Sequence, residues 1–222
     1  MSYELYTIAG APRPWRAMLG LIAKGIPFTP RVLEASSKQH KAPAFLALNP
    51  RGRVPVLVQG DFVLSESLAI LAYLDRVQPE PSLFGRTAEQ IGRVWEQVMV
   101  ADHHLREATQ AVVGPMLGVR DPVSEEVLTQ AGAKLKDELA RIETRLERGA
   151  FLCGDAISAA DCVAFPEVRL TLRTGERFPE VTARLGLHPL SDIFPRVARW
   201  IARIEALPGY DQTFPAHWTP RV

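Results

Sequence analysis

Glu66 and Ser67 are the residues whose types and spacing best suit the binding of a small charged molecule. We place both in the first turn of a helix that begins after Ser65, a residue type that favours the N-cap position. The unpaired N–H groups of such a turn, together with the Ser67 hydroxyl, can hold a carboxylate, and the Glu66 carboxylate can accept from an ammonium group. An α-amino acid carries both of these charges. The alternative interpretation is that Glu66 only complements the helix dipole.

Pro55 is the second candidate, because it lies near the start of a strand predicted over residues 54–58. A proline cannot donate to the hydrogen-bond ladder, so it is usually confined to an edge, a bulge or the first residue of a strand. A cis peptide bond between Val54 and Pro55 would turn the N–H and C=O of Val54 toward a ligand. The alternative is a trans proline, the form that most X-Pro bonds adopt.

The elements that must position these residues alternate between strands and helices up to about residue 80. Residue patterns predict strands at residues 5–8, 28–33, 54–58 and 62–64, and helices at residues 15–22, 43–48 and after Ser65. The strand–helix–strand beginning implies a parallel pair, and the turn at residues 59–61 adds an antiparallel hairpin. The order β-α-β-α-β-β-α predicts the α/β class for this part of the chain.

The second part of the chain is predicted to be all-helical. Helices are expected from Thr87 to about residue 113, from Asp121-Pro122 to Gly149, from Ser158 onward and at residues 195–207. Gly114-Pro115 is expected to break the first of them. The predicted domains are residues 1–80 and 87–222, joined by a linker at residues 81–86.

Composition excludes several classes of function. Among 222 residues, 26 Lys and Arg stand against 25 Asp and Glu, a net charge of +1 that argues against nucleic-acid binding. No apolar run approaches the ~18 residues that a membrane-spanning helix needs, so no membrane partner is expected. The two cysteines, Cys153 and Cys162, are too few for a disulfide framework, which favours a cytoplasmic location. His103 and His104 diverge on a helix, so no metal site is expected there.

Taken together, the motifs resemble those of the cytosolic glutathione transferase family, and the N-terminal motif is similar to that of bacterial, phi, theta and tau-like members. Residues 49–55 (NPRGRVP) and Glu66-Ser67 match its glutathione-binding half. Arg16 and residues 24–26 match its first helix, and residues 152–161 match its C-terminal signature. The resemblance covers essentially the whole chain. It implies a thioredoxin-like N-terminal domain, an all-helical C-terminal domain that holds the electrophile, and a homodimer.

For two parts of glutathione, the resemblance implies binding residues directly. The backbone of Val54, presented by a cis-Pro55, would pair with the cysteinyl part. Glu66 and Ser67 would hold the γ-glutamyl part, which carries the α-amino acid charges inferred above for their ligand.

The remaining assignments are to the two ends of glutathione. His40, Lys41 and Arg53 would face the glycine carboxylate, and Asp102 would reach the γ-glutamyl ammonium across a dimer. The alternative for His40 and Lys41 is a solvated loop, and the alternative for Asp102 is an exposed carboxylate on a helix face.

Ala11 departs from the family pattern, because relatives carry Ser or Cys at this position and a methyl group can neither donate to a thiolate nor form a mixed disulfide. Thr7 falls where another group of classes carries a tyrosine. A free thiol has a pKa near about 8.5, so only a few per cent is ionised at neutral pH without help. We hypothesise weak activation by Arg13 and the helix dipole, with Thr7 as the alternative donor.

The implied function is the conjugation of glutathione, a co-substrate, to a small hydrophobic electrophile, as in detoxification, with no metal required. Because Ala11 is inert, two alternatives stay open. One is a non-catalytic glutathione-binding carrier or regulatory protein. The other is a glutathione-dependent isomerase or ether-cleaving enzyme of the same fold.

Overall fold

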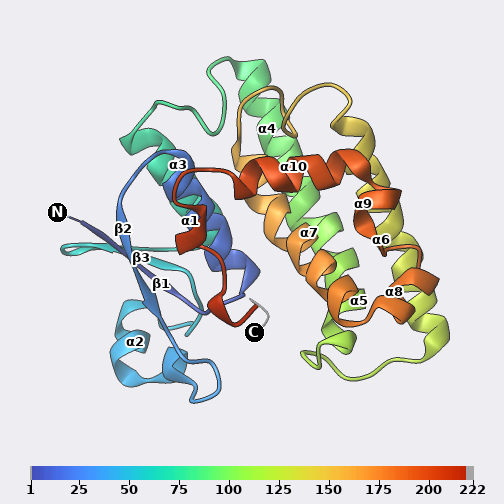
Figure 1. Cartoon of the computed structure of the whole chain (residues 1–222). Coiled ribbons are helices and arrows are strands. Elements are labelled where there is room, and N and C mark those ends of the chain that lie inside the picture. The colour runs from blue at the N-terminus through green and yellow to red at the C-terminus, as the bar shows by residue number, and fades with distance from the viewer. Residues whose placement is uncertain (1, 219–222) are drawn as a thin grey trace. The chain divides into compact units, whose positions relative to one another are not determined.

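The computed structural model describes residues 2–218, which form two compact units (Figure 1). Residues 2–84 and 205–218 belong to one unit, and Gly85–Ile204 form the other. The boundary after residue 84 falls inside the predicted linker. Residues 219–222, which the predicted helical domain includes, lie outside the described part of the chain. Among the described helices, none combines the length and the apolar character needed to cross a membrane.

The N-terminal unit is built on a four-stranded mixed sheet in the order β2-β1-β3-β4. Its elements are β1 (Tyr3–Thr7), α1 (Pro12–Ala23), β2 (Phe28–Val32), α2 (Pro43–Leu48), β3 (Val56–Gln59), β4 (Phe62–Ser65) and α3 (Ser67–Val77). β1 pairs with β2 in parallel and with β3 in antiparallel fashion, and β3 and β4 form the hairpin. The α/β class and the element order predicted from sequence are confirmed.

Alternation along β1 sends its side chains to two faces of the sheet. Tyr3, Leu5 and Thr7 are buried on one face. Tyr6 points to the other face, where its ring lies 5.7 Å from that of Phe45 in α2. Because neighbouring strand residues face opposite ways, Thr7 rather than Tyr6 shares the face of Leu5, as the sequence pattern predicts.

The C-terminal segment after α10 (Pro195–Glu205) packs with the N-terminal unit, whereas the sequence pattern predicts that it continues the helical domain. Trp15 Nε1 of α1 donates a buried hydrogen bond of 2.9 Å to Thr213 Oγ1. The rings of Phe214 and Trp218 pack on Trp15, with centroids 6.3 and 5.4 Å from it. These contacts join residues about 200 positions apart, and local sequence patterns carry no signal for them.

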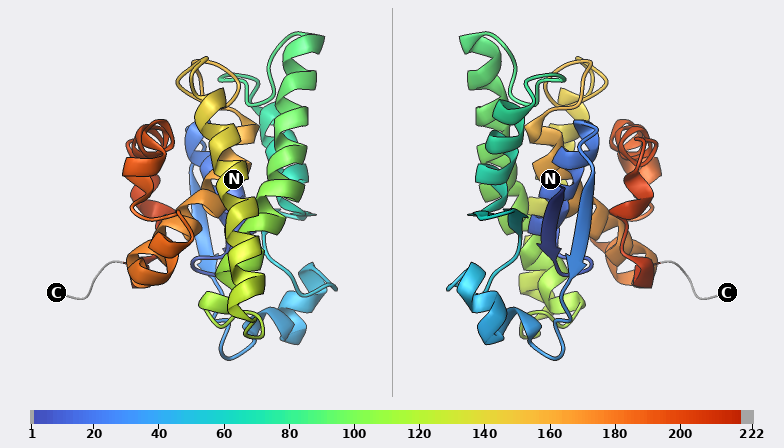
Figure 2. Two further views of the ribbon diagram at one scale, coloured as in Figure 1. Left: turned by 90° about the vertical axis from the view of Figure 1, so that its right-hand side faces the viewer. Right: turned by 90° about the vertical axis from the view of Figure 1, so that its left-hand side faces the viewer.

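The second unit is a bundle of helices (Figure 2). They are α4 (Ala88–Val100), a π-helical segment (Ala101–Leu105), α5 (Arg106–Met116), α6 (Glu125–Arg145), α7 (Ala159–Arg177), α8 (Pro179–Arg184), α9 (Leu190–Ile193) and α10. The first three run without a break from residue 88 to residue 116. The all-helical class predicted for this part of the chain is confirmed.

Two predicted helix ends in this unit are wrong. Gly114-Pro115 lies inside the last turn of α5, where the missing N–H of proline removes only one hydrogen bond, so the helix continues to Met116. α6 starts three residues after Asp121-Pro122, because Ser124 takes the N-cap position and its Oγ accepts from Val127 N–H at 3.3 Å.

Asp161, in the first turn of α7, is completely buried and accepts four hydrogen bonds. Its Oδ2 accepts from the N–H and the hydroxyl of Ser158 at 2.9 and 2.7 Å, which completes the predicted capping box. Its Oδ1 accepts from Leu152 N–H at 2.9 Å and from Trp200 Nε1 at 2.8 Å. Burial raises the pKa of this carboxyl, and the hydrogen bonds oppose that rise. Asp161 therefore ties α7, α10 and the loop before α7 together.

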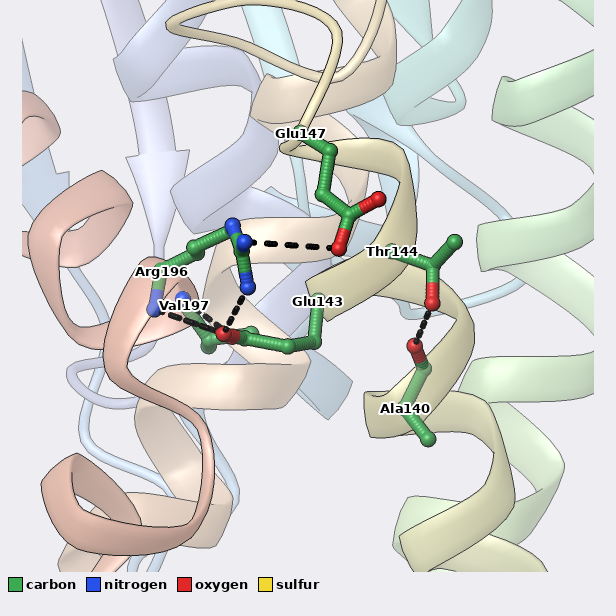
Figure 3. Close-up of polar contacts among 6 residues, drawn as sticks. All are labelled: Ala140, Glu143, Thr144, Glu147, Arg196 and Val197. Carbon is green, nitrogen blue, oxygen red and sulfur yellow. Dashed lines mark hydrogen bonds and ion pairs between the residues drawn. The ribbon is translucent and has the colours of Figure 1, made fainter.

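Glu143 of α6 caps the start of α10 (Figure 3). Its carboxylate accepts from the N–H groups of Arg196 and Val197 at 2.9 Å, and the Arg196 guanidinium also reaches Glu147 at 3.4 Å. A carboxylate from another helix thus replaces the usual local N-cap side chain.

Candidate functional site

The strand register collects the predicted binding segments at one end of the sheet. β1 pairs with β3 through Tyr6 and Val56, and Val56 in turn pairs with Ser65 of β4. The residues next to these three therefore lie together at that end: Thr7, Pro55 and Glu66. Segments that are distant in sequence are thus neighbours in the N-terminal unit.

Glu66 has a left-handed backbone conformation, with φ +71° and ψ 116°. It is the N-cap of α3, so the prediction that Ser65 caps this helix and that Glu66 lies in its first turn is wrong. Ser65 instead pairs with Val56 as the last residue of β4. A positive φ is uncommon for residues other than glycine, and such strain often accompanies a functional site.

The N-terminus of α3 has no side-chain cap. The N–H groups of its first turn therefore lack the partner that a capping residue supplies. Ser67 is buried, and Glu66 is exposed. Neither side chain forms a hydrogen bond or an ion pair with another residue in the range 2–218. The site offers a hydroxyl, a helix N-terminus and a carboxylate within two residues.

The Val54–Pro55 peptide bond is cis. Val54 lies outside β3, and its N–H and C=O form no hydrogen bond with any other described residue. Asn49 orders the preceding turn, because its side chain donates to Arg53 C=O at 2.7 Å and accepts from Arg51 N–H at 3.1 Å. Asn49 is a positioning residue, and its place in the NPRGRVP motif is the only sequence signal for this role.

His40 and Lys41 lie against this turn. Lys41 Nζ donates to the C=O groups of Arg51 and Gly52 at 3.2 and 3.0 Å. Gly52 has φ +56°, and a Cβ there would lie 2.8 Å from the C=O of His40, so the turn requires glycine. His40 Nδ1 is buried without a hydrogen-bond partner among the described residues. Arg53 is exposed.

Ala11 is the N-cap of α1 and offers no side-chain cap. Its N–H donates to Ile8 C=O at 3.0 Å. Pro12 and Pro14 carry no N–H, so Arg13 has the only N–H among residues 12–14. The start of α1 is therefore much poorer in donors than an ordinary helix N-terminus.

Thr7 is buried, and its hydroxyl makes a long contact of 3.5 Å with Ile8 C=O. Asp102, by contrast, belongs to the other unit, where it lies in the π-helical segment. In that segment His103 Nδ1 lies 3.0 Å from Met99 C=O. Within residues 2–218, no three His, Cys, Asp or Glu side chains are grouped to hold a metal ion.

We expect the thiol of Cys153 to be almost unreactive, although it is only partly buried, whereas Cys162 is fully buried. Burial and, less strongly, the charge of Asp161 raise the pKa of Cys153 to about 11. At pH 8 about one such thiol in a thousand is ionised, against roughly a quarter of free thiols. Mass spectrometry should show alkylation of Cys153 by iodoacetamide at least about 100-fold slower than that of free cysteine. Comparable rates would contradict the raised pKa.

Comparisons with known proteins show similarity to one family over most of the chain. A model of the glutathione S-transferase N-terminal domain matches residues 1–76, and a model of the C-terminal domain matches residues 100–208. Human glutathione S-transferase theta-1 is 32% identical over 225 residues, which covers 98% of this chain and 88% of that protein. Glutathione S-transferase F10 of Arabidopsis thaliana is 32% identical over 158 residues, which covers 68% of this chain and 73% of that protein.

Solved structures give the same result. The crystal structure of a glutathione S-transferase from the Antarctic clam Laternula elliptica superimposes with a TM-score of 0.85 and 26% identity, covering 100% of this chain and 95% of that one. The two domain models, the relatives and this structural likeness show that the chain belongs to the glutathione S-transferase family.

Proposed function

We propose that this glutathione transferase binds glutathione at the end of the sheet where β1 and β4 finish and β3 begins, and conjugates it to a small hydrophobic electrophile. The left-handed Glu66 beside the uncapped start of α3 is the observation that carries the proposal. The carboxylate of the γ-glutamyl part binds the helix N-terminus and Ser67, and its ammonium binds Glu66. Asp102 is a further candidate for this ammonium, through a dimer.

The cysteinyl part of glutathione pairs with the backbone of Val54. The geometry that supports this is the cis peptide bond and the absence of any other described partner for the N–H and C=O of Val54. The glycine carboxylate lies toward His40, Lys41 and Arg53. Because Lys41 already donates to two carbonyl groups of the turn, it orders the loop and adds positive charge there.

Thiol activation is weak in this proposal. Lowering the pKa of a thiol by two units requires about 2.7 kcal/mol. A helix dipole contributes about 0.3–1 kcal/mol, and here two prolines remove N–H donors from the first turn of α1. We assign the rest of the free energy that lowers the thiol pKa to two groups. They are Arg13, through its charge and its N–H, and the Thr7 hydroxyl. Ala11 marks the place of the missing hydroxyl.

Calorimetric titration with glutathione tests the binding site. We expect Ser67→Ala to raise the dissociation constant about fivefold to tenfold, the usual effect of one lost hydrogen bond. Glu66→Gln should raise it similarly for glutathione, but should leave the affinity for a glutathione analogue without the γ-glutamyl amino group unchanged. Glu89→Gln, which changes a carboxylate at the start of α4, is the matched control. Unchanged affinity in both Glu66→Gln and Ser67→Ala would place the γ-glutamyl part elsewhere.

The inert side chain of Ala11 favours one second candidate, a glutathione-binding carrier without turnover. Thermal unfolding and product assays together distinguish the carrier from the conjugating enzyme. A ligand that binds only the native state raises the thermal stability of the protein whether or not the ligand reacts. Stabilisation by glutathione without product formation from a panel of electrophiles would favour the carrier.

A cytosolic homodimer is part of the same proposal. Phe62 and Val63 of β4 and Val77 of α3 are exposed apolar residues of the N-terminal unit, with exposed fractions of 41%, 39% and 50%. Phe62 stacks on Tyr73 of α3 at 4.8 Å, so β4 and α3 present these two rings together. Such a surface suits a subunit contact. The balanced composition and the two cysteines, which form no disulfide, suit a cytosolic detoxification enzyme.

A further inference from the structure

The segments that form the glycine end of the proposed glutathione site are strongly basic. Residues 35–60 contain Lys38, Lys41, Arg51 and Arg53 but no aspartate or glutamate, whereas the whole chain has a net charge of only +1. We call these four side chains the basic cluster. Glutathione brings a single carboxylate to this end of the site, so the positive charge of the basic cluster exceeds what its glycine residue can neutralise.

Hydrogen bonds hold the two segments of the basic cluster together. Lys38 immediately precedes a 3-10 helix, Gln39–Lys41, and its C=O accepts from Lys41 N–H at 2.7 Å. Lys41 Nζ in turn donates to the C=O groups of Arg51 and Gly52 at 3.2 and 3.0 Å. The loop that carries Lys38 and the turn that carries Arg51 are therefore neighbours in the folded N-terminal unit.

Within residues 2–218, the basic cluster has no carboxylate partner. The side chains of Lys38, Arg51 and Arg53 are exposed and form no hydrogen bond or ion pair with any residue of that range. Glu34, the preceding carboxylate along the chain, accepts from the N–H and the hydroxyl of Ser36 at 3.3 and 2.9 Å. The next acidic residue after the cluster lies in the turn between β3 and β4, at the opposite end of the sheet from the site. A ligand can therefore supply the missing negative charge.

Lys38 has a left-handed backbone conformation, with φ +56° and ψ 33°. Among the residues that the structure describes, Lys38 and Glu66 are the two non-glycine residues with a positive φ. Such conformations are uncommon and tend to occur at functional sites. Glu66 lies at the γ-glutamyl end of the proposed site, and Lys38 belongs to the basic cluster at its glycine end. The two strained residues thus lie at opposite ends of the same proposed ligand.

We propose that Lys38 and Arg51 bind a second carboxylate, so that the site binds a γ-glutamylcysteinyl peptide that ends in an acidic residue more tightly than it binds glutathione. The α-carboxylate of that last residue lies toward His40, Lys41 and Arg53, and the second carboxylate is that of its side chain. This inference rests on the function proposed above, because it uses the same placement of the ligand. Since exposed ion pairs are individually weak, two of them give a preference of about threefold to tenfold.

Calorimetric titrations with three peptides test the inference: glutathione, γ-Glu-Cys-Asp and γ-Glu-Cys-Asn. The aspartate and asparagine peptides have nearly the same size and shape and differ in one negative charge. We expect the aspartate peptide to bind about threefold to tenfold more tightly than the asparagine peptide and than glutathione. The difference should nearly disappear at about 1 M NaCl, where the Debye length is only about 3 Å.

A double variant of the full chain, Lys38→Asn/Arg51→Gln, removes both charges assigned to the second carboxylate. Asparagine is chosen at position 38 because it tolerates the left-handed conformation. We expect the aspartate and asparagine peptides to bind this variant equally, and the dissociation constant for glutathione to change by less than about twofold. Arg76→Gln, which removes an exposed arginine from the last turn of α3, is the matched control and should leave the preference for aspartate unchanged.

Three results would overturn the inference. If glutathione binds but the aspartate and asparagine peptides bind the wild type equally, no second carboxylate is recognised, and the function proposed above still stands. If the preference for aspartate persists in the double variant, the second carboxylate does not lie at Lys38 and Arg51. If none of the three peptides binds, the proposed function itself fails, and this inference fails with it. Far-UV circular dichroism and urea midpoints show whether the variants remain folded.

Discussion

Asp161→Ala is expected to lower the free energy of unfolding by about 3–5 kcal/mol, because it leaves four donors of the helical unit without their acceptor. The carboxylate is fully buried and accepts from Ser158 twice, from Leu152 and from Trp200. An unsatisfied buried donor costs about 1–3 kcal/mol, and local rearrangement recovers part of the sum. Since domains of this kind have a total stability of about 5–15 kcal/mol, much of the protein should be unfolded at modest urea concentrations.

Urea denaturation followed by circular dichroism measures this loss, and three smaller changes separate its parts. Trp200→Phe removes a single donor and should cost about 1–1.5 kcal/mol for the hydrogen bond, with a small change in packing. Ser158→Ala removes the N-cap hydroxyl and should cost about 1 kcal/mol. Asp161→Asn keeps one acceptor oxygen, so its loss in the free energy of unfolding should lie between the losses of these two variants and that of Asp161→Ala. A loss below about 1 kcal/mol for Asp161→Ala would show that the network contributes little, whatever its geometry.

Much of the fold follows from local patterns, because the period of apolar residues and the turn types directly report the elements of the N-terminal unit. The capping boxes at Thr87 and Ser158 were predictable for the same reason, since all of their atoms lie within four residues. The return of residues 205–218 to α1 was not predictable. It depends on contacts such as Trp15 with Thr213, whose only signal is complementary packing across the folded chain.

Local sequence patterns also predict the candidate site only in part. The motif around Pro55 and the pair Glu66-Ser67 point to the binding region, but local preference places the helix cap at Ser65. Pairing of Ser65 with Val56 prevents this and forces Glu66 into the left-handed region, which local propensity disfavours for glutamate.

Ala11→Ser is expected to lower the pKa of the thiol of bound glutathione by about one to two units, because a hydrogen bond to a charged group contributes about 1.5–3 kcal/mol. The start of α1 offers few competing donors, since Ala11 N–H is bound to Ile8 and residues 12 and 14 are prolines. The thiolate fraction below the pKa should therefore rise about 10- to 100-fold. Because a less basic thiolate is also a weaker nucleophile, the rate should rise less, roughly 3- to 10-fold.

Ultraviolet absorbance of the enzyme-bound thiolate as a function of pH gives the pKa, and initial rates with 1-chloro-2,4-dinitrobenzene give the gain in kcat/KM. Ala11→Val, which adds a branched side chain without a donor, is the control for changes in shape. If the serine and valine variants show the same thiol pKa as the wild type, position 11 does not face the sulfur and the proposed placement of glutathione is wrong at its thiol end. If serine lowers the pKa without raising the rate, a step other than thiol ionisation limits turnover. In that case the hydroxyl missing at Ala11 would not limit the rate, because a larger thiolate fraction would bring no faster catalysis.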